Sequence, residues 1–256
     1  MTLQINNLNF AYSAKKPILQ DITVDGFKEG RLTALIGPNA TGKSTFFKCV
    51  AGLLKIDATT ITVAGENSAQ LGRSAWNRKV CYMPQAFSSN AALTVFDVIL
   101  LARKNLAGWR VSDDDVDVVA ATLEKVSISH LSETFVGDLS GGQQQMVSIA
   151  QTLVRDPALF LLDEPTSALD LRHQLQIMSI IRDESRARNI LSIVALHDLN
   201  LAARFADHVV LMREGRVVLS GTPQEVLSSP ELAKTYGVNI DIHETKDGIL
   251  TVAASL

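Results

Sequence analysis

The sequence predicts an α/β protein built on a mostly parallel core sheet. Three apolar runs of strand length, at residues 32–36, 158–162 and 190–196, are continuous or nearly so, as in parallel strands covered on both faces. Segments with helical spacing separate these runs, and such strand–helix–strand alternation favours a parallel sheet. With 256 residues, 46% of them hydrophobic and 20% charged, the chain is long enough to bury a sizeable core.

The first part of the chain predicts an antiparallel sheet ahead of the first buried strand. Apolar positions alternate with polar ones there, at Leu3, Ile5, Leu8 and Phe10 and again at Ile18, Ile22 and Val24. After the strand at 32–36 we expect a helix at 44–54 and a β-branched strand at 59–63 that ends in a turn at 64–67. A short apolar strand at 79–83 should follow.

The middle of the chain changes to a helical period. Val95, Val98, Ile99 and Ala102 share one helical face, and Val116, Val119, Leu123 and Val126 share another. Asp113, Asp114 and Asp115 open the second helix, where they are more simply explained as water-facing partners of the helix dipole than as a metal site. Residues 86–156 are therefore expected to form a helical subdomain inserted into one domain that spans residues 1–256.

The last third returns to alternating elements. A helix is indicated by the spacing of Leu171, Leu175, Met178 and Ile181. A hairpin at 209–212 and 217–220 turns on Glu214 and Gly215, and two short helices should lie at 223–227 and 230–236. Residues 249–252 could add an edge strand.

Composition excludes several classes of protein. No run approaches the eighteen uninterrupted apolar residues of a spanning helix, and the N-terminus lacks a signal-peptide pattern. Cys49 and Cys81 sit in apolar surroundings without metal-ligand spacing, which favours buried thiols in a reducing compartment. The net charge of −3 indicates no nucleic-acid surface.

One nine-residue stretch organises the chain, and it reads Gly37, Pro38, Asn39, Ala40, Thr41, Gly42, Lys43, Ser44 and Thr45. A glycine-rich loop between a buried strand and a helix wraps its backbone around a phosphate, and the helix N-terminus adds donors and a favourable dipole. Lys43 should reach the β- and γ-phosphates of a nucleotide, and Ser44 should hold Mg²⁺. The loop alone leaves kinases, GTPases and many ATPases open.

A second motif narrows the choice. Leu139, Ser140, Gly141, Gly142 and Gln143 lie between the phosphate loop and the apolar strand that ends in Asp163 and Glu164. Because Tyr12, Gln85, His197 and the stretch 167–170 also stand in the family's order, the chain resembles the ATP-binding-cassette (ABC) ATPase family over nearly its whole length. The resemblance implies a P-loop NTPase fold with an N-terminal antiparallel β subdomain and an inserted α-helical subdomain, and it implies ATP and Mg²⁺ as ligands.

Four polar residues at strand ends are candidates for the chemistry. Asp163 can hold Mg²⁺ through water, and Glu164 can polarise the water that attacks the γ-phosphorus. His197 could donate to the γ-phosphate; a lone histidine is usually structural, so the family resemblance selects it. Gln85 could sense Mg²⁺ or the attacking water, and in the family its loop relays the nucleotide state to the membrane partner.

The remaining family positions imply stacking and dimerisation. Tyr12 resembles the aromatic residue that stacks on adenine, although Phe10 and Tyr12 could equally pack on the sheet. Ser140 and the amides of Gly141 and Gly142 open a helix, which makes a second anion site without a phosphate of its own. The family arrangement brings the partner's ATP to residues Ser140 to Gln143 through a head-to-tail homodimer, with Asp170 at the interface.

Two departures from the family pattern affect these expectations. Ala40 stands where the family often has glycine, and a positive φ there would cost an alanine about 1 kcal/mol. We therefore expect that positive φ is not required at Ala40. Gln144 and Gln145 follow the signature where a basic residue is common at the second position, which affects contacts just beyond Gly142.

The sequence thus predicts the ATP-hydrolysing subunit of an ABC transporter, peripheral on the cytoplasmic face of the inner membrane. Residues 78–85, 93–98 and 196–202 resemble importers of the iron-siderophore, haem and cobalamin type. The expected partners are a second copy, integral-membrane permease subunits and, indirectly, a substrate-binding protein. One alternative is an ABC subunit for a different cargo. Another is a soluble ABC ATPase that acts in translation or DNA maintenance, which is disfavoured by the single cassette and the absence of a basic patch. A small-molecule kinase or GTPase shares only the phosphate loop.

Overall fold

A six-stranded sheet forms the core of the computed structural model, which describes residues 2–13, 16–56, 60–85, 92–104, 110–246 and 248–256. The strand order is β10-β9-β3-β8-β7-β6, and all neighbours are parallel except the outer pair β9 and β10. The strands are β3 (Leu32–Ile36), β6 (Val80–Met83), β7 (Leu159–Asp163), β8 (Leu191–Ala195), β9 (His208–Arg213) and β10 (Arg216–Gly221). The predicted parallel sheet is confirmed.

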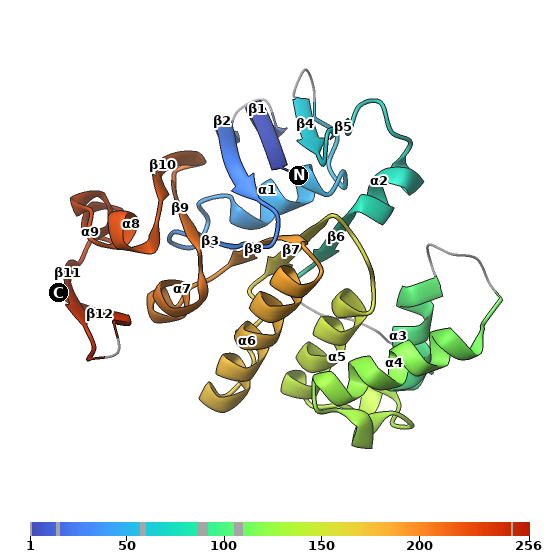
Figure 1. The fold of residues 1–256 in the computed structure, drawn as a ribbon. Coiled ribbons are helices and arrows are strands. Elements are labelled where there is room, and N and C mark those ends of the chain that lie inside the picture. Colours follow the sequence, from blue (N-terminus) through green and yellow to red (C-terminus); the bar gives the residue numbers. More distant parts are fainter. Residues whose placement is uncertain (1, 14–15, 57–59, 86–91, 105–109, 247) are drawn as a thin grey trace.

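Both faces of this sheet are covered, which explains the continuous apolar runs. Figure 1 shows α1 (Lys43–Val50) on one face and α5 (Gly141–Leu153) and α6 (Leu171–Ala187) on the other. Successive residues of β3 enter different cores: Leu35 packs in the cluster that contains Phe47 of α1, whereas Ile36 packs in the cluster that contains Ile177 of α6. A strand buried on both sides is therefore mostly apolar, and Thr33 is the one polar residue of β3.

A second, antiparallel sheet lies over α1, as the alternating N-terminal pattern predicts. It has the order β2-β1-β4-β5, with β1 (Thr2–Ser13), β2 (Lys16–Lys28), β4 (Thr60–Val63) and β5 (Glu66–Asn67). Leu3 and Ile5 of β1 point into the cluster around α1. The turn expected at 64–67 is shorter, because Glu66 and Asn67 pair back onto β4. The helix expected at 44–54 likewise ends at Val50.

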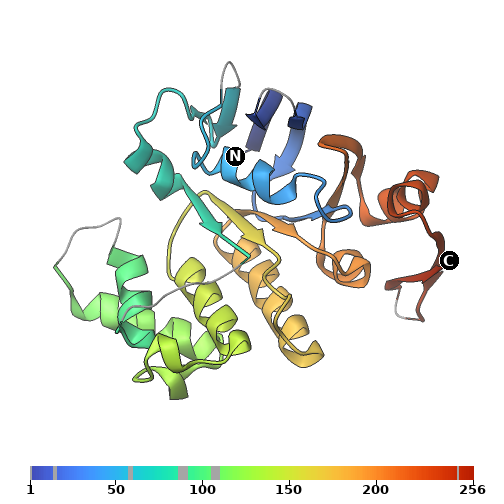
Figure 2. The ribbon, with the colours of Figure 1, turned by 180° about the vertical axis from the view of Figure 1, so that it is seen from behind.

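The regular elements described between β6 and β7 are all helices, joined by turns and one isolated β-bridge between Thr94 and Phe135, and the expected start at residue 86 lies outside the described residues. These elements are α3 (Val95–Lys104), α4 (Asp113–Lys125), the short 3₁₀ turns Ser129–Leu131 and Val136–Asp138, and α5. Val98, Ile99, Val119 and Leu123 are buried as the spacing predicts. Val116 is 40% exposed, so its assignment to the buried face was wrong. Figures 1 and 2 both place α3 and α4 at the end of the molecule opposite the C-terminus.

Asp115 corrects the expectation that all three aspartates face water. Its carboxylate is buried and accepts hydrogen bonds at 2.8 Å from Arg103 Nε and from Lys104 Nζ, which join α3 to α4. It also completes a capping box, because the Ser112 N–H donates to Asp115 and the Asp115 N–H donates to the Ser112 hydroxyl. The hydrogen bond from Lys104, followed by that from the Ser112 backbone, holds the pKa of Asp115 well below its usual range.

Two helices were not anticipated, α2 (Arg73–Lys79) and α7 (Leu199–Phe205). Both have seven residues, which is too short to show a helical period. In α6, Ile177, Met178 and Ile181 are buried, but Leu171 is 69% exposed and does not belong to the buried face.

The C-terminal elements match their predicted bounds except at the end. The hairpin β9–β10 and the helices α8 (Pro223–Leu227) and α9 (Pro230–Tyr236) lie where expected. The expected edge strand at 249–252 is instead β12 (Leu250–Ser255), which pairs with β11 (Asn239–Glu244) in a separate two-stranded sheet. β12 pairs with β11 along its length and is therefore not an edge strand of the main sheet.

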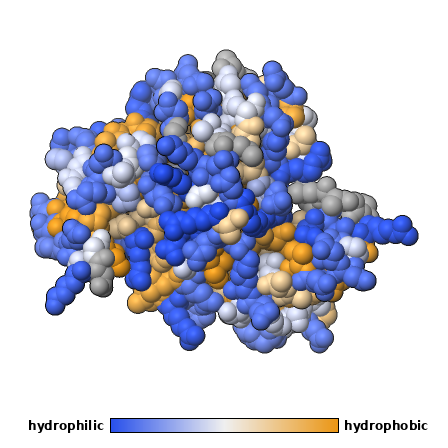
Figure 3. Space-filling model, viewed as in Figure 1, coloured by the Kyte–Doolittle hydropathy of each residue, from blue (hydrophilic) through white to orange (hydrophobic). Residues whose placement is uncertain are grey.

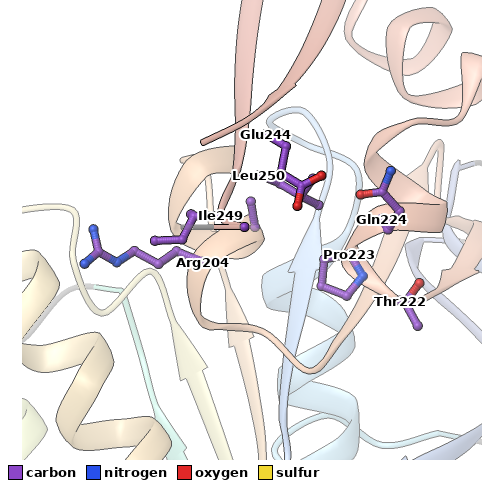
Figure 4. Close-up of a pocket in the computed structure, with 9 residues that line it drawn as sticks. Arg204, Thr222, Pro223, Gln224, Glu244, Ile249 and Leu250 are labelled. Carbon is purple, nitrogen blue, oxygen red and sulfur yellow. The ribbon is translucent and has the colours of Figure 1, made fainter. Parts of the chain in front are cut away.

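This C-terminal segment leaves a pocket of about 360 Å³ beside α7 and α8. Figure 4 shows Gln224 of α8 and Glu244 of β11 on its walls, with Ile249 and Leu250 below them. None of the residues predicted for the nucleotide site lines this pocket.

The surface and the thiols agree with the composition. In the part of the chain that the structure describes, no helix has the length and apolar character needed to cross a membrane. The face in Figure 3 is mostly hydrophilic, with apolar residues in several separate patches. Cys49 and Cys81 are buried and unbridged, and burial raises the pKa of the Cys49 thiol to about 12.

Candidate active site

The predicted site residues follow the carboxyl ends of four adjacent parallel strands. The phosphate loop follows β3, His197 follows β8, Asp163 and Glu164 end β7, and Gln85 follows β6. Because parallel strands end at the same edge, residues far apart in sequence meet there, at the usual binding edge of an α/β sheet.

Two positions in the phosphate loop accept only glycine. Gly37 has a φ of 146°, and a Cβ there would lie 2.3 Å from the Met212 carbonyl oxygen of β9. Gly42 has a φ of 101°, and a Cβ there would lie 2.8 Å from the Leu19 side chain. The loop is therefore pressed against β9 on one side and β2 on the other.

Ala40 contradicts the expectation of an ordinary backbone, because its φ is 62°. The neighbouring bonds force this turn: the Thr41 hydroxyl donates to the Pro38 carbonyl at 2.9 Å, and the Thr41 carbonyl accepts from the Gly215 N–H at 3.1 Å. The left-handed conformation is thus required here, and the alanine bears its cost of about 1 kcal/mol.

Replacing Ala40 with glycine should stabilise the protein. Relief of the left-handed alanine is expected to raise the free energy of unfolding by about 1 kcal/mol and the melting midpoint by about 2–4 °C. Thermal and urea unfolding measure both quantities. Ala11→Gly, at an exposed strand position without positive φ, is the matched control and should lower stability. If the free energy of unfolding also falls in Ala40→Gly, the loop conformation carries no strain.

Lys43 is buried at the base of the loop. Its Nζ donates to the carbonyls of Gly37 at 2.6 Å and Pro38 at 3.0 Å. Burial lowers the pKa of Lys43, and the carboxylates of Glu164 and Asp163 oppose that shift. The ammonium is therefore held by backbone dipoles and two nearby acids, close to the loop that would wrap the phosphates.

Asp163 has an oxygen available for a metal ion. The residue is 1% exposed, its Oδ2 accepts from the Tyr82 hydroxyl at 3.3 Å, and its Oδ1 is buried without a hydrogen-bond partner among the residues that the structure describes. Burial raises the pKa of Asp163, and hydrogen bonding by Ser44 and Tyr82 opposes the rise. An orphaned carboxylate oxygen beside a serine hydroxyl fits Mg²⁺, which takes few protein oxygens together with water and phosphate.

Glu164 contacts two other predicted residues, Gln85 and His197. Its Oε1 lies 2.5 Å from His197 Nε2, and its Oε2 accepts from Gln85 Nε2 at 2.6 Å. The backbone of Glu164 is left-handed, with a φ of 52°, a conformation that persists in a non-glycine residue only where its surroundings enforce it. Both carboxylate oxygens are therefore aimed by partners on neighbouring strands.

Gln145 holds the backbone of Glu164, a role that the sequence did not reveal. It is buried on α5, and its Nε2 donates to the Glu164 carbonyl at 3.3 Å. The same carbonyl accepts from the Ser167 hydroxyl at 3.1 Å. A glutamine on the buried face of a helix was the available signal, because a buried amide needs a partner.

The signature lies apart from the phosphate loop and beside the stretch that contains Asp170. Ser140 caps α5, because its hydroxyl accepts from the Gln143 N–H at 3.4 Å while Gln143 Oε1 accepts from the Ser140 N–H at 2.9 Å. A Cβ on Gly142 would lie 3.2 Å from the Ala168 carbonyl oxygen. Ser140 and Gly141 are exposed, so the amides that open α5 face solvent.

Asp170 has a partner that sequence reasoning did not assign. Its Oδ1 caps α6 by accepting from the His173 N–H at 2.9 Å, and it lies 2.8 Å from His173 Nδ1. The backbone hydrogen bond from His173 is the main reason that the pKa of Asp170 is lowered. Asp170 is exposed, as an interface residue requires.

Tyr12 remains outside the packed sheet. Its side chain is 61% exposed, and its ring meets Phe10 edge-on at a centroid separation of 4.9 Å. An exposed, oriented ring favours the stacking alternative over packing within the sheet.

Known proteins share this architecture along nearly the whole chain. The family model described as ABC transporter matches residues 19–167. An uncharacterized ABC transporter ATP-binding protein of Methanocaldococcus jannaschii is 37% identical over 246 residues, which cover 96% of this chain and 95% of that protein. A hemin import ATP-binding protein of Shewanella denitrificans is 34% identical, with 97% of this chain and 98% of that protein covered. A structure assigned to an inward-facing, metal-chelate type ABC transporter has a TM-score of 0.83 at 26% identity, covering 100% of this chain and 98% of that one.

The matched family region spans more than half of the chain and runs from β2 through Glu164. ABC cassettes bind ATP and are ATPases coupled to transport, which agrees with a phosphate loop placed beside a Glu164 carboxylate held on both oxygens. The chain belongs to the ABC transporter family, as one of its ATP-binding proteins.

Proposed function

We propose that this chain is a single ABC nucleotide-binding domain that hydrolyses ATP to energise import of an iron-siderophore, haem or cobalamin type of substrate. It would act at the cytoplasmic face of the cell membrane. The observation that carries the proposal is the Glu164 carboxylate, which Gln85 and His197 hold from opposite oxygens at the strand edge that also bears the phosphate loop. The hemin import relative and the metal-chelate type structure support the substrate class.

The side chains divide the work of phosphoryl transfer. Lys43 would leave the Gly37 and Pro38 carbonyls for the β- and γ-phosphates of ATP. Glu164 would orient the attacking water and accept its proton, and His197 would steady the γ-phosphate. When Mg²⁺ is bound at Asp163 and Ser44, with Gln85 nearby, it supplies positive charge to the phosphates. Tyr12 would stack on the adenine.

The exposed signature supports a homodimer. The residues from Ser140 to Gln143 present a helix N-terminus to solvent and lie beside Ala168, not beside the phosphate loop of their own chain. A second copy in head-to-tail orientation would place its ATP against this N-terminus, where the helix dipole favours the γ-phosphate. Asp170 and the exposed Leu171 would lie at that interface.

We propose that a permease loop docks beside Gln85. A pocket of about 510 Å³ lies against Tyr82 of β6, three residues before Gln85 in the sequence. Arg73, Arg155 and the apolar Leu53 also line it. None of its described lining residues is acidic, so an acidic segment of the permease would be complementary.

Co-expression with a candidate permease of the metal-chelate importer type tests the transport function. We expect the chain to sediment with membranes only when the permease is present and its ATPase activity to rise in the assembled complex. Reconstituted vesicles that take up a haem, a ferric siderophore or cobalamin on ATP addition would identify the cargo. A chain that never associates with a membrane protein but pellets with ribosomes or DNA would support the soluble alternative instead.

Charge reversal at the pocket tests the docking site. Arg73→Glu should reduce co-purification with the permease about tenfold or more, because it replaces attraction of an acidic segment by repulsion. Lys28→Glu, the same reversal at an exposed position on β2, should co-purify normally. Affinity capture through a tagged permease measures both variants, and nucleotide binding reports whether each is folded. Equal capture of Arg73→Glu and the wild type would place docking elsewhere.

A further inference from the structure

We infer that Tyr236, in the C-terminal helix α9, is a positioning residue that holds the phosphate loop and thereby sets ATP affinity. The inference rests on the proposed ATP binding and adds a role for a segment that lies beyond the family match.

The contact is a single directed hydrogen bond. The Gly37 N–H donates to the Tyr236 hydroxyl at 2.9 Å, across 199 positions of sequence. Tyr236 is largely buried, and burial raises the pKa of its phenol to about 12, so the hydroxyl stays neutral near physiological pH. A partly buried backbone N–H needs such an acceptor, and loss of the hydroxyl would leave it unpaired.

Gly37 depends on this hydrogen bond for its position in the loop. Its φ of 146° and the close approach of the Met212 carbonyl admit no side chain, so packing by its own side chain cannot hold it. Its carbonyl is also the closer of the two acceptors of Lys43 Nζ, at 2.6 Å. Tyr236 therefore holds the loop residue from which the Lys43 ammonium would move to the phosphates.

Helix α9 is itself anchored to the strand beside the loop. Leu232 is fully buried, and Glu231 accepts from Arg213 Nη1, at the end of β9, at 3.1 Å. Lys234 donates to the same carboxylate at 2.8 Å. A seven-residue helix has little stability of its own, so these tertiary contacts fix where Tyr236 lies.

The chain beyond α9 reaches a second part of the site. Asn200 of α7 exchanges two hydrogen bonds with the Val252 backbone of β12, accepting from its N–H at 2.8 Å and donating to its carbonyl at 3.3 Å. Because α7 begins two residues after His197, the C-terminal segment contacts both the phosphate loop and the helix that follows His197. Figure 1 shows α9 and the β11–β12 hairpin beside β9, β10 and α7.

The test compares Tyr236→Phe with Thr235→Val in the full chain. Tyr236→Phe removes the hydroxyl that accepts from Gly37, whereas Thr235→Val removes a neighbouring hydroxyl that is buried and has no partner among the described residues. We expect the Kd and KM for ATP of Tyr236→Phe to rise about three- to tenfold, the range of one lost hydrogen bond. Turnover at saturating ATP should change less than twofold, and Thr235→Val should match the wild type.

Residue-resolved hydrogen exchange measures the hydrogen bond between the Gly37 N–H and the Tyr236 hydroxyl directly. The Gly37 amide should be protected in the wild type and in Thr235→Val and should exchange faster in Tyr236→Phe. The inference would be overturned if Tyr236→Phe changed neither the ATP affinity nor the exchange rate of the Gly37 amide. It would also be overturned if Tyr236→Phe and Thr235→Val weakened ATP binding equally. If Tyr236→Phe fails to fold, an unprotected Gly37 amide in the wild type would overturn it, and a protected one would support it. A wild-type chain that binds no ATP would refute the proposed function instead.

Discussion

Glu164→Gln should lower the rate of ATP hydrolysis by about two to three orders of magnitude while ATP binding stays near the wild-type value. Glutamine has the size of glutamate and can still meet Gln85 and His197, which contact the carboxylate at 2.6 and 2.5 Å. It cannot accept a proton from the attacking water, and positioned proton transfer contributes about 10²- to 10⁴-fold to catalysis. The variant should therefore bind ATP, close and remain closed.

Two measurements separate binding from turnover in this variant. Phosphate release gives the hydrolysis rate, and size-exclusion chromatography with ATP and Mg²⁺ should show a dimer that persists in Glu164→Gln and is transient in the wild type. Glu124→Gln removes an exposed carboxylate on α4 and should behave as the wild type. Normal turnover by Glu164→Gln would exclude Glu164 as the base.

Ser140→Arg should abolish dimer-dependent hydrolysis and leave ATP binding by the single chain intact. The Ser140 hydroxyl caps α5 at an exposed position, and an arginine there removes the cap and fills the space in front of the helix N-terminus. Loss of the cap alone should cost about 1 kcal/mol of stability. The larger effect is steric, because the partner's ATP could no longer approach the amides of Gly141 and Gly142.

Fluorescent-nucleotide titration and analytical ultracentrifugation check this expectation. Ser140→Arg should bind nucleotide with wild-type affinity but stay monomeric with ATP, whereas Ser228→Arg, at the exposed end of α8, should still dimerise. Loss of nucleotide binding in Ser140→Arg would mean that the signature serves the phosphate loop of its own chain.

The parts of the fold that depend on neighbouring residues could be predicted from the sequence. The continuous runs of β3, β7 and β8 identify strands buried on both faces, and proline at the first position of α8 and α9 marks helix starts that the structure reproduces. The candidate site could be predicted because its residues end adjacent parallel strands, and parallel strands share one edge.

The remaining features depend on contacts between distant segments. Asp115 is a water-facing charge in its own helix and becomes a buried ion pair only when α3 packs beside α4. Ala40 takes a positive φ because Thr41 donates to the Pro38 carbonyl and accepts from the Gly215 N–H, which closes the turn around it. The seven-residue helices α2 and α7 carry too few residues for a period to show.

The sequence by itself determined the family, the parallel core and the choice of the residues proposed to meet ATP, because spacing and residue type encode the loop and the strand ends. Only the tertiary structure decided what holds those residues. Gln145 supports Glu164, His173 pairs with Asp170, and Tyr236 closes on Gly37. The two longer-range contacts join residues 19 and 199 positions apart, and no local pattern specifies which distant side chain a folded chain will bring to a given backbone group.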